Sequence, residues 1–130
     1  MPGTGFDIVD IRRITGWAAR YDMPVLATVF TPRELALQTT SLWPVALAIC
    51  FCAKEALIKA LGMNIGLAQL DLIEVGIAGQ VLRVCLRENE KLTVAHGCWR
   101  LLPDERLATA LILDEWVRCE QLFSEDTNNR

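Results

Sequence analysis

The chain has 130 residues, of which 52% are hydrophobic and 22% charged, and its 13 basic and 16 acidic side chains give a net charge of −3. This length is typical of one domain, and the composition excludes a disordered, collagen-like or low-complexity chain. The small negative charge supplies no basic field for nucleic acid. The mean hydropathy of +0.29 is high for a small protein, which indicates a rich core or a surface buried against other copies of the chain.

No segment has the pattern of a membrane span or a secretory leader. The longest near-apolar run, residues 43–53, is shorter than the roughly 18–20 residues that a span needs. The N-terminal residues lack a cationic stretch followed by an apolar one. The five cysteines form no CxxC pair, so we expect reduced thiols in a cytoplasmic protein rather than a zinc site.

The first part of the chain predicts a strand followed by short helices. Residues 5–11 set acidic side chains into an apolar run, which is typical of a strand. The apolar spacing in residues 12–18 favours a short amphipathic helix. Further on, Thr31 is placed to cap a helix, with Pro32 at its first position and Glu34 completing a capping box.

A long helix is predicted to begin near residues 41–44 and to end at Leu61. Gly62 follows it and can adopt the left-handed conformation that ends many helices. Residues 45–53 are apolar almost all round, so we expect this helix to be largely buried.

The second half of the chain predicts strands. Alternating or continuous apolar runs separated by turn residues indicate strands at residues 70–75, 81–87, 92–101 and 107–113. Residues 114–123 suit a closing helix, and residues 124–130 form a polar tail. Helices first and strands later predict an α+β domain.

Two segments set carboxylates and lysines beside apolar neighbours. Asp7 lies in the first strand, and Lys54, Glu55 and Lys59 lie at the end of the long helix. Magnesium sites use one or two carboxylates together with water and phosphate oxygens, and lysines neutralise the same phosphates. The alternative is structural: Glu55 and Lys59 share a helix face and would form an ion pair worth about 0.2–0.5 kcal/mol.

Three stretches in this order are GTGFDIVDIRRI (residues 3–14), VFTPREL (29–35) and FCAKEALIKALG (51–62). On these motifs the chain resembles the small phosphopantetheinyl transferases of the holo-acyl-carrier-protein synthase type. LDLIEV (70–75) and VAH (94–96) match more loosely. The resemblance covers nearly the whole chain.

The resemblance implies an α+β fold in which an antiparallel sheet packs on a long buried helix, within one domain spanning residues 1–123. It implies a homotrimer with active sites at the subunit boundaries. It also implies a cytoplasmic, Mg²⁺-dependent enzyme that transfers 4′-phosphopantetheine from coenzyme A to a serine of an apo acyl carrier protein and releases 3′,5′-ADP.

The resemblance assigns roles to four residues of the charged segments. Asp7 and Glu55 match the carboxylates that hold the metal ion, and Glu55 is also the candidate acceptor of the serine proton. Lys54 and Lys59 match lysines near the phosphates of coenzyme A, where positive charge assists phosphoryl transfer.

Three further matches concern the ends of the two substrates. His96 falls where the family has a histidine near the nucleotide end of coenzyme A, and Arg12 and Arg13 fall where it contacts the acidic recognition helix of the carrier. The sequence departs from the family at Cys50 and Thr28, where arginine is usual. Losing these permanent charges bears on the binding of coenzyme A and of the usual carrier.

Two functional alternatives stay open beside an active transferase. One is a non-catalytic relative that binds a carrier protein or a synthase partner as a structural subunit. The other is a trimeric α+β module without a ligand, which requires the motif match to be accidental. Retention of Asp7, Lys54, Glu55 and Lys59 favours the transferase.

Overall fold

The structure, a computed structural model, describes residues 3–39, 45–62, 67–88, 90–102 and 107–113. Its elements, in chain order, are β1 (Gly5–Asp10), α1 (Ile11–Arg20), α2 (Met23–Leu26), α3 (Pro32–Leu35), the 3₁₀ helix η1 (Ala36–Thr39), α4 (Val45–Leu61), the 3₁₀ helix η2 (Leu67–Leu72), β2 (Ile73–Ala78), β3 (Val81–Glu88), β4 (Lys91–Leu101) and β5 (Leu107–Leu113). The α+β prediction is confirmed. The expected helix at residues 114–123 and the tail at 124–130 lie outside the described residues.

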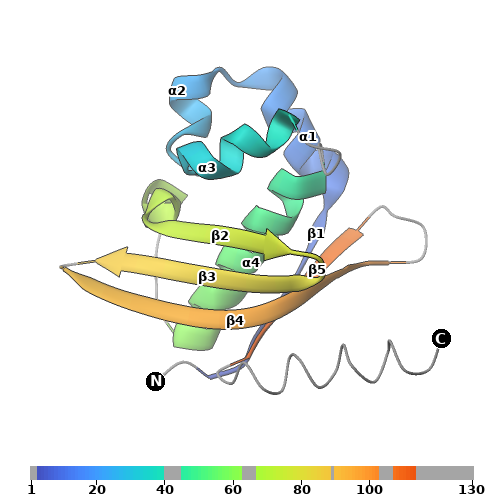
Figure 1. Ribbon diagram of the computed structural model, residues 1–130. Coiled ribbons are helices and arrows are strands. Elements are labelled where there is room, and N and C mark those ends of the chain that lie inside the picture. Colours follow the sequence, from blue (N-terminus) through green and yellow to red (C-terminus); the bar gives the residue numbers. More distant parts are fainter. Residues whose placement is uncertain (1–2, 40–44, 63–66, 89, 103–106, 114–130) are drawn as a thin grey trace.

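The strands form one antiparallel sheet in the order β1-β5-β4-β3-β2. The N-terminal strand therefore pairs with the last described strand, with Asp7 opposite Ala110. Figure 1 shows α4 running across one face of this sheet, with α1, α2 and α3 gathered near one end of α4. None of the helices in the described part of the chain is long and apolar enough to cross a bilayer.

The core lies between α4 and the sheet. Because side chains alternate along a strand, Val84, Ala95 and Ala110 turn towards α4 and are buried. On β1 the outward side chains remain exposed, Phe6 at 53% and Ile8 at 48%. The sheet thus has a filled face against α4 and, at β1, an apolar outer face.

The helix ends follow the predicted signals. Thr31 caps α3 in a complete capping box with Glu34, and Gly62 has φ of +65° directly after α4. Helix α2 was not predicted, although Asp22 caps it and Pro24 lies in its first turn. The beginning predicted for α4 at residues 41–44 lies outside the described residues.

The strand predicted at residues 70–75 is wrong in its first half, because η2 occupies residues up to Leu72 and β2 begins at Ile73. Leu70 and Ile73 are buried while the two residues between them are exposed. This period of three is that of a 3₁₀ turn rather than of a strand.

Candidate functional site

The predicted acidic residue of β1 meets the end of α4. The Lys59 ammonium donates to Asp7 Oδ1 at 2.7 Å and to the Phe6 carbonyl at 3.3 Å. The structural alternative for Lys59 was an ion pair with Glu55 on the helix face, whereas the ion pair found in the described residues joins Lys59 to Asp7. Lys59 therefore bridges α4 to β1, and its hydrogen bond with Asp7 is the main cause that raises its pKa above 10.5.

Small residues allow β1 to approach α4 so closely. Gly5 lies against the backbone of α4, where a Cβ would come within 1.9 Å of the Ala56 carbonyl oxygen. The Gly3 N–H donates to the Ala60 carbonyl at 2.9 Å. These contacts hold the strand that carries Asp7 alongside the last turns of the helix.

Glu55 belongs to the same cluster. Its side chain is half-buried, and burial is the largest cause that raises its pKa above 4.5, followed by the negative charge of Asp7. Lys59 and Arg13 act in the opposite direction. Two carboxylates that repel one another across β1 and α4 form a place where a further positive charge is stabilised.

Cys52 is a neighbour of this cluster to which the sequence analysis assigned no role. Its spacing to Glu55 and Lys59 on α4 puts it on nearly the same helix face, which is the signal that was available. The buried thiol lies beside Asp7, and burial and that carboxylate raise the pKa of Cys52 to about 12. The thiol also donates to the Ala108 carbonyl at 3.5 Å.

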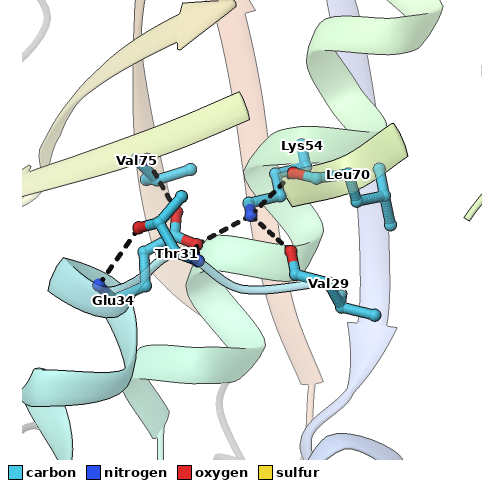
Figure 2. Close-up of polar contacts among 6 residues, drawn as sticks. All are labelled: Val29, Thr31, Glu34, Lys54, Leu70 and Val75. Carbon is cyan, nitrogen blue, oxygen red and sulfur yellow. Dashed lines mark hydrogen bonds and ion pairs between the residues drawn. The ribbon is translucent and has the colours of Figure 1, made fainter. Parts of the chain in front are cut away.

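Lys54 lies elsewhere than expected. Its side chain is fully buried and forms an ion pair of 2.7 Å with the equally buried Glu34. Its ammonium also donates to the carbonyls of Val29 at 2.6 Å and Leu70 at 3.0 Å, as Figure 2 shows. A lysine with no exposed atom cannot contact a phosphate from outside, so the expectation that Lys54 binds coenzyme A is corrected to a role inside the fold.

The two arginines expected to bind a carrier lie at the start of α1. Arg12 is 70% exposed at its side chain and pairs with Asp10 at 3.1 Å. The Arg13 guanidinium lies 5.1 Å from the ring centroid of Trp17 and 5.8 Å from that of Phe51. Arg13 thus lies beside the carboxylate cluster, and Arg12 extends from it into solvent.

His96 lies on the face of the sheet that is turned away from α4 and from the Asp7 cluster. Its neighbours on β4, Ala95 and Gly97, are buried towards α4, so the alternation of the strand turns His96 away from α4. It lies opposite Arg83 of β3 in the sheet register. One chain therefore does not bring His96 to Asp7 and Glu55.

The donor set fits a hard divalent cation. Within the described residues, no group of three or more His, Cys, Asp and Glu side chains gathers to hold a metal by itself. Asp7 and Glu55 supply two carboxylates, and Mg²⁺ is commonly held by one or two carboxylates with water and substrate oxygens completing its coordination. The two residues are therefore suited to Mg²⁺ rather than to a metal enclosed by protein ligands.

Comparison with known protein families gives a match over nearly the whole chain. The profile described as the 4′-phosphopantetheinyl transferase superfamily matches residues 3–112. The holo-[acyl-carrier-protein] synthase of Geotalea daltonii is 30% identical over 87% of this chain and 97% of its own length. That of Clavibacter sepedonicus is 34% identical over 87% and 94%. With the synthase of Syntrophus aciditrophicus, which is 41% identical, the match spans about half of each protein.

Solved structures share the fold. Holo-[acyl-carrier-protein] synthase from Neisseria meningitidis has a TM-score of 0.64 at 25% identity and covers 88% of this chain and 99% of its own. The Helicobacter pylori synthase, solved in complex with coenzyme A, has a TM-score of 0.63 at 24% identity, with 86% and 99% covered. The five-stranded sheet and its helices therefore match an architecture already known for these synthases.

Proposed function

The chain belongs to the 4′-phosphopantetheinyl transferase superfamily, and from this membership we propose that it transfers 4′-phosphopantetheine from coenzyme A to a serine hydroxyl of an apo acyl carrier protein. The observation that carries the proposal is the pair of Asp7 and Glu55 beside Lys59, on β1 and α4. The two relatives that match over nearly their whole length are both named holo-[acyl-carrier-protein] synthase. A structural subunit without activity is not favoured, because it would not need this charged cluster.

The residues of the cluster suit the chemistry of the transfer. The serine oxygen forms a bond to the phosphorus that carries the pantetheine arm, and the bond from that phosphorus to 3′,5′-ADP breaks. When bound by Asp7 and Glu55, Mg²⁺ supplies positive charge against the pyrophosphate oxygens. Lys59 adds a mobile positive charge at the same place.

The serine must lose its proton as it attacks. Glu55 is the proposed acceptor, directly or through a water molecule. Its carboxylate lies half-buried in the cluster with Asp7 and Lys59, and a carboxylate held at the reacting centre is a common proton acceptor. The proton then resides on Glu55 until solvent removes it.

The arginines of α1 suit a carrier protein. Acidic helices are attracted by local positive charge even when the net charge of the chain is negative. Arg12 and Arg13 are both exposed, and the charge of Arg13 acts on Glu55. A carrier that docks on Arg12 and Arg13 would present its serine next to the proposed base.

We also propose a homotrimer in which neighbouring chains complete each site. Phe6 and Ile8 expose apolar surface on the outer face of β1, and such surface is typical of contacts between subunits. His96 lies on the opposite face of the sheet from the Asp7 cluster, so a neighbour is needed to supply it for the nucleotide end of coenzyme A. The free thiols of the described cysteines suit a reducing, cytoplasmic location.

The transfer is tested by the intact mass of apo carrier proteins incubated with the protein, Mg²⁺ and coenzyme A. We expect one carrier or more to gain the mass of one phosphopantetheine. Glu55→Gln should lower the rate by about 100-fold or more, while Asp71→Asn, which removes an exposed carboxylate, should leave it unchanged. If no carrier gains mass, the proposal is wrong.

The shared site is tested by mixing two inactive variants. Asp7→Asn and His96→Ala subunits, dissociated and reassembled together, should regain part of the activity because some mixed sites contain both native residues. No regain in reassembled mixtures would contradict a site built from two chains.

A further inference from the structure

A second charged group of α4 lies inside the protein and has no part in the proposed chemistry. Lys54 directly precedes Glu55, so the two side chains leave the helix about 100° apart. Glu55 turns towards β1, while Lys54 enters the core on the side of α3 and β2 (Figure 2). Both Lys54 and its partner Glu34 have no exposed side-chain surface.

The hydrogen bonds of this buried pair are complete. The three donors of the Lys54 ammonium meet Glu34 Oε1 and the carbonyls of Val29 and Leu70. Glu34 Oε1 also accepts from the Thr31 N–H at 2.9 Å, and Oε2 accepts from the Val75 N–H at 2.7 Å. The pair therefore joins α4 to the cap of α3, to η2 and to β2.

This network fixes α4 more strictly than its apolar contacts do. Apolar contacts are not directional, whereas a buried charge that leaves its partner loses strong and directional interactions in a medium of low dielectric constant. Because Glu34 and the two carbonyls belong to other segments, sliding α4 by the rise of one residue, about 1.5 Å, would disturb the contacts of 2.7, 2.6 and 3.0 Å that Lys54 makes with them. Rotation of the helix would do the same.

We propose that Glu34 and Lys54 are positioning residues that set the axial position and rotation of α4, so that Glu55 and Lys59 face Asp7. This inference rests on the proposed function, because it gives the helix position a role in holding a divalent cation. The pair acts through the backbone of α4 and touches neither the metal ion nor the substrates.

The test uses the double variant Glu34→Gln/Lys54→Met, which removes both charges at similar volume and leaves no isolated buried charge. Mn²⁺ serves as the probe, and its affinity is measured by calorimetry at a temperature where circular dichroism shows the variant folded. We expect affinity to fall by about tenfold or more, the range found when the supporting shell of a metal site is changed. The matched control is Arg33→Gln/Glu74→Gln, which removes a surface ion pair of 3.9 Å and should leave Mn²⁺ affinity unchanged.

Each result decides the matter. If the folded double variant binds Mn²⁺ within about twofold of the wild type while melting earlier, the pair only stabilises the fold and the inference is overturned. If the double variant does not fold, Glu34→Asp replaces it: this change keeps the charge but shortens the side chain, and unchanged Mn²⁺ affinity would again overturn the inference. A wild-type protein that neither binds Mn²⁺ nor modifies a carrier defeats the proposed function itself, and this inference with it.

Discussion

Gly5→Ala tests whether the close approach of β1 to α4 builds the site. The added Cβ would lie 1.9 Å from the Ala56 carbonyl oxygen and 2.8 Å from the Ala60 nitrogen. Both neighbours are backbone atoms of a helix, so they cannot turn aside as the end of a flexible side chain would. The strand itself must move away from α4.

The size of this movement follows from the contact distances. Ordinary contacts of a Cβ begin at 3.4 Å, so β1 must retreat by about 1.5 Å or deform, and overpacking of this kind costs about 1–3 kcal/mol. The same movement stretches the contact of 2.7 Å between Lys59 and Asp7. We therefore expect both a lower free energy of unfolding and a weaker site.

Urea unfolding and Mn²⁺ titration measure the two effects. The midpoint should fall by about 1 M urea, and Mn²⁺ affinity should fall in the fraction that remains folded. Gly16→Ala is the control, because a Cβ at Gly16 in α1 meets nothing within 4 Å. This control should gain up to about 1 kcal/mol from the better helix propensity of alanine.

The reasoning is refuted if Gly5→Ala unfolds at the wild-type midpoint and binds Mn²⁺ as tightly. A loss of stability with unchanged Mn²⁺ affinity would refute only the link from strand position to site geometry.

Three further predictions concern the pH dependence of cation binding, the arginines of α1 and the packing of β4 against β5. Mn²⁺ affinity should begin to fall on acidification already above pH 4.5, because burial and Asp7 raise the pKa of Glu55. The protonated carboxyl group does not bind a cation. Calorimetry across a pH series measures this loss of affinity. Arg13→Gln should weaken carrier binding by about tenfold and leave coenzyme A binding unchanged, as measured by surface plasmon resonance. Gly97→Ala should lower the free energy of unfolding by about 1–3 kcal/mol, as measured in urea, because its Cβ would lie 2.2 Å from the Leu111 carbonyl oxygen.

Elements with strong local signals were predictable from the sequence. The strand at residues 107–113 agrees with β5, and the capping box of Thr31 and the left-handed Gly62 follow directly from residue type. The η2 turn was missed because a short apolar run looks alike in both periods until its tertiary contacts are known. One such tertiary contact is made by Leu70 of η2, whose carbonyl accepts a hydrogen bond from the Lys54 ammonium.

The sequence suggested Asp7, Glu55 and Lys59 as site residues but gave no indication of how they pair. Asp7 and Lys59 stand far apart in the chain, and nothing local indicates that they form an ion pair. Lys54 was expected near the phosphates of coenzyme A on the strength of the family resemblance, whereas its side chain is fully buried, which is rare for lysine. Only the fold shows that Glu34, which the sequence marks as a helix cap, also supplies the counter-charge that makes the burial possible.

The side chains of β1 point alternately towards α4 and away from it. Asp7 turns to the cluster on α4, while Phe6 and Ile8 turn outward from the same short ribbon. If the proposed trimer forms through these apolar side chains, a substitution in this strand would therefore affect both the contact between subunits and the charged cluster.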